Sequence, residues 1–331
     1  MSQPTRSTKR RLMLGLKLLL VALVLWGIAR TIVGSLAELE QHAWSLEPKY
    51  LVLSALFYLL AYLPAGIFWW AILRATGQNP RWLETLRAYY IGHLGKYVPG
   101  KAMVVILRTG LIKSQRVDPA VAVVSVFLET LTMMAVGAFV AAAILLTVLP
   151  YDGLLVSIAG GLMIAAGMPT LPPVFRRLAK QVTSRASGEN ANVELEGVTF
   201  GLMLAGWLGN VVGWILMGLS LWAAVLALGA EGADSLTLLP VFTASAALAV
   251  VAGFLSLIPG GAFVRELVLM QILAPVVGSA VALVVAVVLR LVWLVSELAI
   301  SVILYGLGRL LEPKFSAPPE PAVAATELSS K

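Results

Sequence analysis

Long apolar runs with almost no charge are the feature that most limits how this chain can fold. Residues 12–33 and 50–73 each offer about 20 apolar positions, the length a helix needs to cross a hydrocarbon layer of roughly 30 Å. The whole sequence is 60% hydrophobic and only 12% charged, whereas soluble domains carry about 25% charged residues. We therefore predict an all-α polytopic membrane protein.

The apolar runs fall into two kinds, continuous and broken. Two stretches, 82–112 and 237–274, are each interrupted by Pro-Gly, which ends a helix and allows the chain to reverse. We predict that they are re-entrant hairpins, which gives eight apolar segments by hydropathy. The continuous runs predict six full crossings, at residues 12–33, 50–73, 119–149, 154–173, 198–228 and 278–308.

The domain organisation follows from these runs. Residues 1–311 are predicted to form a single transmembrane domain, and the proline-containing residues 312–331 to form a disordered cytoplasmic tail. The run at 12–33 follows a basic segment but is longer than the apolar part of a signal peptide. We expect it to be an uncleaved first helix.

Basic residues in short loops indicate orientation, because such loops favour the cytoplasmic side. The first 17 residues hold five basic side chains and no acidic one, which places the N-terminus in the cytoplasm. Residues 74–118 are basic on both flanks of the first broken stretch, so that stretch should enter and leave from the cytoplasm. Glu231 and Asp234 mark an external connection, and Arg309 and Lys314 place the C-terminus inside. The second broken stretch should then open to the outside.

The two broken stretches indicate an inverted repeat. Val98-Pro99-Gly100-Lys101 recurs as Ile258-Pro259-Gly260-Gly261, and the preceding segments 70–77 and 222–229 share a Trp-Ala start and a Gly end. We predict repeat one over about 50–173 and repeat two over about 198–308. Inverted repeats with broken helices are typical of alternating-access transporters. The alternative to a transporter is a gene duplication that is retained only for helix packing.

Each break predicts a polar cavity, because irregular backbone at membrane depth must be buried in protein or line water. The helix that starts after each break presents free N–H groups and partial positive charge, which suit phosphate or carboxylate. For some basic residues the alternative is snorkelling to the interface. The candidate head-group-binding residues are Lys96, Pro99, Gly100, Lys101, Arg108, Glu129, Pro259, Gly260, Gly261, Arg265, Glu266, Arg290 and Glu297.

Charges inside the apolar runs should be paired, since each costs about 2.5 to 3.5 kcal/mol near the bilayer centre. Glu129 and Arg290 follow their breaks at similar distances, and we predict that they pair across the repeat interface. Arg290 and Glu297 share a helix face. Glu266 could carry a proton, or it could offset the positive charge of Arg265. A purely structural pair without a transport role is the alternative.

Several classes of function are excluded. There is no cysteine, and His42 and His93 are the only histidines, so we expect no metal site and no cofactor. The net charge of +7 lies beside apolar runs, which argues against a nucleic-acid partner. Residues 95–102 approach the phosphate-loop pattern, but Ala102 lacks the hydroxyl that binds magnesium and no strand precedes it.

A family resemblance rests on two segments. Gly95-Lys96-Tyr97-Val98-Pro99-Gly100-Lys101 with Arg108 and Glu129, and Ile258-Pro259-Gly260-Gly261 with Arg265-Glu266, resemble the lysylphosphatidylglycerol synthase transmembrane family, also called flippase-like. The resemblance covers roughly residues 12–310. Thr130, where members often have a second charge, and Ala262-Phe263, in place of a Gly-containing step, depart from the family pattern.

The resemblance implies a bacterial or archaeal cytoplasmic (inner) membrane and a lipid or lipid-linked head group as partner. The family includes the membrane portion of the multiple peptide resistance factor, which resembles a floppase for aminoacylated phosphatidylglycerol. The soluble aminoacyl-transfer domain of large members does not occur in this sequence, so we do not expect lipid aminoacylation by it.

The leading hypothesis is a lipid flippase that moves an anionic phospholipid or a lipid-linked intermediate between leaflets, and not an enzyme. Two alternatives stay open: a membrane-embedded transferase that uses a lipid-linked donor, and a non-transporting factor in cell-envelope assembly. A homo-oligomer or an envelope-biosynthesis partner is compatible with each.

Overall fold

The computed structural model describes residues 46–98, 102–112, 116–148, 157, 161, 163–187, 195–230, 235–256 and 258–311. Every element that it defines over these residues is a helix, which confirms the all-α class. The predicted first helix at 12–33, the tail at 312–331, much of the first half of the crossing at 154–173 and the segment from Pro99 to Lys101 lie outside the described residues.

The chain order is a series of α-helices separated by short 3-10 helices, the latter labelled η. The first half comprises α2 (Pro48–Ala61), α3 (Leu63–Ala75), α4 (Trp82–His93), η1 (Leu94–Tyr97), α5 (Ala102–Ile112), α6 (Pro119–Val148), η2 (Met168–Thr170) and α8 (Pro172–Ser187). The second half comprises α9 (Phe200–Ala227), η3 (Leu236–Leu238), α10 (Leu239–Leu255), η4 (Pro259–Gly261), α11 (Val264–Val277) and α12 (Ser279–Leu311).

Five helical segments of the described chain are long and apolar enough to cross a membrane: 48–75, 119–147, 200–227, 236–255 and 279–308. Four of them coincide with predicted crossings. The fifth, 236–255, contains the first arm of the second broken stretch. The first broken stretch contributes only shorter helices, α4 and α5.

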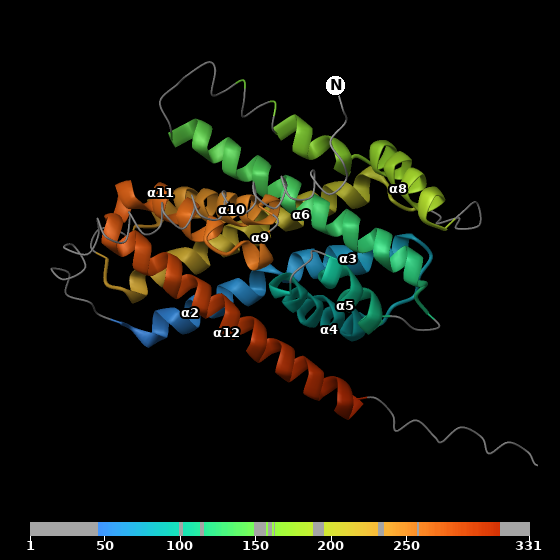
Figure 1. The fold of residues 1–331 in the computed structure, drawn as a ribbon, viewed down its shortest axis with the longest axis horizontal. Coiled ribbons are helices and arrows are strands. Elements are labelled where there is room, and N and C mark those ends of the chain that lie inside the picture. The colour runs from blue at the N-terminus through green and yellow to red at the C-terminus, as the bar shows by residue number, and fades with distance from the viewer. Residues whose placement is uncertain are drawn as a thin grey trace, which may run out of the picture.

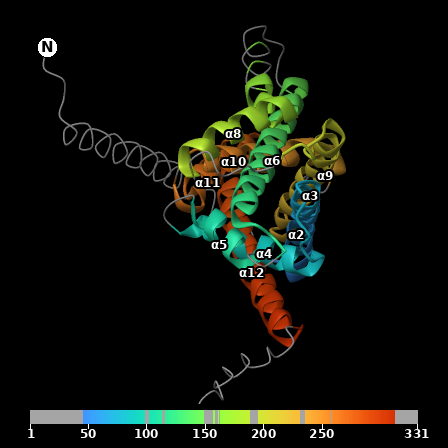
Figure 2. The same ribbon diagram turned by 90° about the vertical axis from the view of Figure 1, so that its right-hand side faces the viewer.

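The helices pack into one bundle that is elongated along the horizontal axis of Figure 1. Helix α9 packs against α2, α3, α6 and α10. Helix α12 runs obliquely, and its C-terminal end projects beyond the other helices in both views (Figures 1 and 2).

Small residues on α9 allow this close packing. A Cβ added at Gly213 would lie 2.7 Å from the carbonyl oxygen of Ala61, and one added at Gly206 would overlap the ring of Phe68. Gly218 lies against Thr243 of α10 in the same way. Close approach through small residues is the usual packing mode of helices in lipid, where burial of apolar surface gives no drive.

Both broken stretches form a pair of helices that pack against each other, α4 with α5 and α10 with α11. The second break depends on Gly260 and Gly261, whose φ values of 60° and 64° suit glycine and few other residues. The two broken stretches meet, because η1 contacts η4. The fold therefore brings the end of the first arm of one stretch next to the Pro-Gly segment of the other.

Candidate functional site

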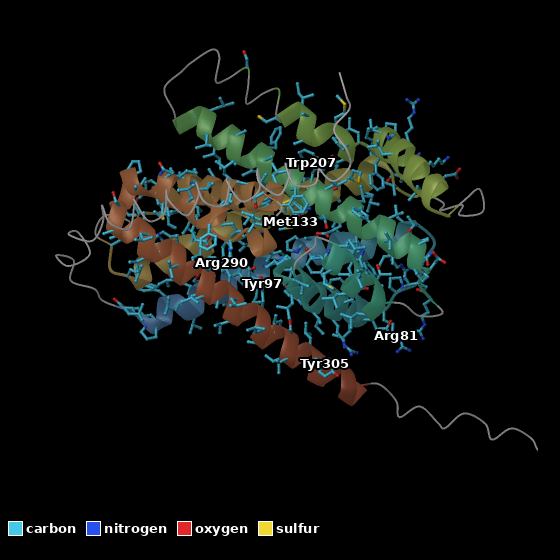
Figure 3. All side chains as sticks on the ribbon, viewed as in Figure 1. Arg81, Tyr97, Met133, Trp207, Arg290 and Tyr305 are labelled. Atoms are coloured by element: carbon cyan, nitrogen blue, oxygen red, sulfur yellow. The ribbon has the colours of Figure 1, made fainter. Side chains whose placement is uncertain are left out.

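A cavity of about 260 Å³ lies where the two broken stretches meet α6. Most of its lining is apolar, and Met133 on this lining lies well inside the bundle in Figure 3, unlike Arg81 and Tyr305 near its edge. The polar side chains that line it are Tyr62, His93, Lys96, Arg108, Glu129, Thr130 and Arg265.

The innermost charges of the cavity are Arg108 on α5 and Glu129 on α6. Their side chains are 2% and 1% exposed, and Nη1 of Arg108 lies 2.5 Å from Oε2 of Glu129. The Tyr89 hydroxyl donates a hydrogen bond to Oε1 of the same carboxylate at 3.0 Å, and the guanidinium lies 4.0 Å from the Tyr89 ring centre. Gly92 on α4 leaves the space that the Arg108 side chain fills. Both carboxylate oxygens of Glu129 thus have a partner.

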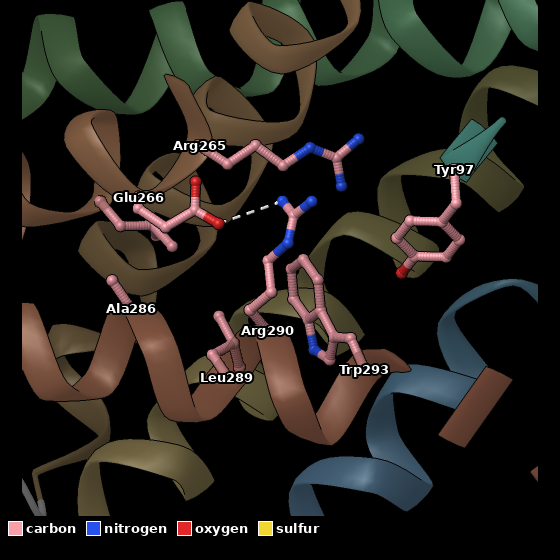
Figure 4. Close-up of a pocket in the computed structure, with 8 residues that line it drawn as sticks. Tyr97, Arg265, Glu266, Ala286, Leu289, Arg290 and Trp293 are labelled. Atoms are coloured by element: carbon pink, nitrogen blue, oxygen red, sulfur yellow. Dashed lines mark ion pairs between the residues drawn. The ribbon is translucent and has the colours of Figure 1, made fainter. Parts of the chain in front are cut away.

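A second ion pair joins Glu266 on α11 to Arg290 on α12. The atoms Nη1 of Arg290 and Oε1 of Glu266 lie 3.2 Å apart, beside Tyr97 and Trp293 (Figure 4). These side chains line a much smaller pocket, of about 10 Å³, which shares Arg265 with the main cavity.

The predicted pair of Glu129 with Arg290 is therefore wrong. Helix α5 packs directly on α6 and α11 packs directly on α12, so each charge on a long helix finds its partner on the adjacent hairpin arm. Both pairs form within a predicted repeat and not between the two. The polarity is reversed, because the arginine lies on the hairpin arm in one case and on the long helix in the other.

A third ion pair does connect the two halves. Nζ of Lys96, in η1, contacts Oε1 of Glu297 on α12, and the Tyr58 hydroxyl donates to the same oxygen. Nε2 of His93 lies 3.9 Å from that oxygen, and Trp293 stacks on the Tyr58 ring with centroids 4.6 Å apart. Since Lys96 and His93 also line the cavity, this buried cluster forms part of its wall.

Arg265 differs from the other charged residues of the site. Within the part of the chain that the structure describes, its side chain makes no ion pair and no hydrogen bond, and its buried Nε has no partner. Gly253 and Gly261 enclose its stem, because a Cβ added at either would come within 2.8 Å of Nε. Figure 4 shows its guanidinium group near that of Arg290, while the dashed ion pair runs to Arg290 alone.

The predicted site residues are distributed as follows. Glu266 and Arg290 line the small pocket, and Glu297 lies behind Lys96. Pro99, Gly100 and Lys101 lie outside the described residues, and of Pro259 only the backbone, which begins η4, is described. The residues that line the main cavity are Lys96, Arg108, Glu129, Gly260, Gly261 and Arg265.

Snorkelling does not describe Lys96 and Arg108. Both side chains are largely buried, and both bind buried carboxylates instead of extending to the surface. Their role is internal to the site.

Sequence reasoning missed the aromatic partners of these carboxylates, Tyr58, Tyr89 and Tyr97, and also His93. A tyrosine inside an apolar helix is the signal that could have identified them, because a buried hydroxyl normally needs a hydrogen-bond partner. Tyr58 and Tyr62 lie one turn apart on α2 and its C-terminal cap. His93 directly precedes the first break.

The lining of the cavity is amphiphilic. Lys96, Arg108 and Arg265 are among its lining residues, and so are Phe127 and Leu131, which are 52% and 37% exposed on α6. Such a cavity suits a ligand with an anionic group and an attached apolar chain.

Comparison with known proteins gives one family match. No curated protein matches the chain. A family match, described as the lysylphosphatidylglycerol synthase TM region, covers residues 13–300 and so includes all the helices that form the cavity. The chain therefore belongs to the family of lysylphosphatidylglycerol synthase TM regions.

Proposed function

We propose that the chain is a translocase that moves an anionic phospholipid or lipid-linked intermediate across the bacterial cytoplasmic membrane. The observation that carries the proposal is Arg265, a cation with no protein partner among the described residues, placed in an amphiphilic cavity where η1 meets η4. An unpaired charge at such a position costs stability, and a role in binding accounts for its presence.

Lipid is the substrate class because the cavity combines cations with an exposed apolar edge. The head group would bind near Arg265, and the acyl chains would leave past Phe127 and Leu131 toward the lipid. Only the head group then needs a polar path through the membrane. This division reduces the cost of moving the whole amphiphile.

The internal symmetry supports an alternating-access mechanism. Arg108 on the second arm of one hairpin lies over Gly92 of the first arm, and Arg265 lies over Gly253 in the other hairpin. Each hairpin is also tied to the following long helix by an Arg–Glu pair. These matched contacts support the inverted repeat of 50–173 and 198–308, with hairpins that open to opposite sides.

The contact between the breaks supplies the element that would move. Tyr97 in η1 packs on Gly260, where an added Cβ would lie 3.1 Å from the ring. In the cycle that we propose, this contact closes the path on one side of Arg265 and opens to let the head group pass toward Arg290.

Reconstitution tests the proposal. Phospholipids that carry a fluorophore on one acyl chain are placed in proteoliposomes, and dithionite reports how fast the inner-leaflet label reaches the outer leaflet. We expect the protein to accelerate an anionic lipid, and Arg265→Gln to abolish the acceleration. Arg74→Gln is the matched control, because Arg74 is exposed at the end of α3 and does not line the cavity.

Two results would contradict the proposal. Equal rates in protein-free vesicles and in vesicles with folded protein, over several anionic lipids, would rule out translocation and favour an assembly role. Transport that is unchanged in Arg265→Gln would rule out this residue as the head-group site.

A further inference from the structure

We infer that the cavity selects head groups that carry a single negative charge, that is, phosphodiester monoanions over phosphomonoesters and diphosphates. The inference rests on the proposed function and narrows its substrate class. It follows from how the charges of the site compensate one another.

Among the described residues, the charged side chains of the two pockets and their wall form three ion pairs, and one cation remains unpaired. Arg108 pairs with Glu129, Arg290 with Glu266, and Lys96 with Glu297. Arg265 remains. Within the described part of the chain, the site therefore has a net charge of one guanidinium group, with His93 as its only histidine.

One bound negative charge would neutralise this site. A second would have no counter-charge, in a cavity whose lining is mostly apolar and where charges are weakly screened. Among the described residues, it could obtain a cation only by taking Arg108, Lys96 or Arg290 from its carboxylate, which would leave Glu129, Glu297 or Glu266 without its partner. Loss of one member of a buried pair is strongly unfavourable.

The geometry of Arg265 suits a phosphodiester. Gly253 and Gly261 hold its stem, and Nε is the one nitrogen of its guanidinium that is both buried and unpartnered. The terminal nitrogens are thus the atoms available to a ligand. Guanidinium groups bind two oxygens of one phosphate side by side, and a phosphodiester has two non-bridging oxygens that share its single charge.

The test compares lipids that differ only in the head group, each with the same labelled acyl chains. Phosphatidylmethanol is a monoanionic diester, phosphatidylcholine is zwitterionic, and phosphatidic acid at pH 9 and diacylglycerol diphosphate carry at least two charges. We expect phosphatidylmethanol to move fastest and the multiply charged lipids to move about tenfold more slowly or worse. Equal or faster movement of the multiply charged lipids would overturn the inference.

Variants that change the charge of the cavity should shift the preference in a stated direction. Thr130→Lys adds a positive charge to the lining without breaking an ion pair, and Glu129→Gln adds one by releasing Arg108. Both variants should increase the rate at which phosphatidic acid moves relative to the rate for phosphatidylmethanol. Arg265→Gln should remove the preference for phosphatidylmethanol over phosphatidylcholine, and Arg74→Gln should leave every ratio unchanged.

A binding measurement keeps this inference separate from the proposed function. Short-chain versions of the four lipids are added to detergent-solubilised protein, and the shift in melting temperature is recorded. If the monoanionic diester gives the largest shift but the protein moves no lipid, the inferred head-group selectivity stands and the proposed translocation is rejected. The same shift with dimethyl phosphate would show that the acyl chains are not needed, and no preference among the lipids would reject the selectivity.

Discussion

Arg108 and Arg265 occupy matched places in the two hairpins but have opposite electrostatic surroundings. Arg108→Gln leaves Glu129 buried without its cation, and we expect the free energy of unfolding to fall by about 3 to 5 kcal/mol. Arg265→Gln removes a charge with no protein partner, and we expect the protein to melt at the same or a higher temperature. Thermal unfolding in detergent measures both.

Greater stability with loss of transport is the signature expected of a residue kept for binding. If Arg265→Gln melts well below the parent protein while Arg108→Gln does not, the assignment of paired and unpaired charges would be reversed.

The Lys96–Glu297 pair gives a second prediction at this scale. Both groups are buried and in contact, so loss of either one should cost more than loss of both. We expect a double-mutant cycle with Lys96→Met and Glu297→Gln to show a coupling of about 1 to 3 kcal/mol in unfolding experiments. Tyr58→Phe should weaken the coupling, because its hydroxyl binds the same oxygen. Additive losses would contradict a direct pair.

At the scale of elements, the contact between η1 and η4 gives a prediction with a close control. Gly260 (φ 60°, ψ 7°) and Gly278 (φ 82°, ψ 155°) both have positive φ, and alanine should cost about 1 kcal/mol of backbone strain at Gly260 and more, up to about 3 kcal/mol, at Gly278, whose conformation is nearly restricted to glycine. Only at Gly260 would the new methyl group press on Tyr97 and Arg290, since no atom lies within 4 Å of a Cβ at Gly278.

We therefore expect Gly260→Ala to slow lipid movement by about tenfold or more and Gly278→Ala to leave it near the parent rate. The fluorescent-lipid assay, with melting temperatures recorded beside it, separates this effect from simple loss of folded protein. Equal slowing by the two variants would mean that strain, and not the contact between the breaks, is responsible.

The elements themselves could be predicted from sequence because each depends on local information. Long apolar runs predicted the helices at 48–75, 119–147, 200–227 and 279–308, and the Pro-Gly dipeptides predicted both breaks. The partners of buried charges could not be predicted in this way. Glu129 selects Arg108 because α5 packs on α6, and Tyr58 reaches Glu297 across 239 positions. Such choices depend on which helices are neighbours.

At the scale of the whole molecule, the placement of the two breaks on opposite sides is open to a labelling experiment. The chain has no cysteine, so single cysteines carry no background. We expect cysteine at Leu83 to react with an impermeant maleimide only in opened cells, and cysteine at Ser279 to react in intact spheroplasts. The basic residues in the loops are the physical reason.

Cysteine at Ser256 decides the path of the second broken stretch. The segment 236–255 is long enough to cross the membrane, which would bring Ser256 to the cytoplasmic side. A re-entrant hairpin instead predicts slow labelling of Ser256 from outside. Labelling only from the cytoplasm would replace that hairpin with two full crossings.

The pairing of each arginine with a glutamate of its own half has a consequence for the chain as two modules. Each half holds both members of its own pair, Arg108 with Glu129 and Glu266 with Arg290, so neither half needs the other to neutralise these charges. The Lys96–Glu297 pair, by contrast, joins one half to the other. Two copies of one half would place two lysines or two glutamates face to face there. Heterotypic reassembly of separately made halves is thereby favoured over self-association.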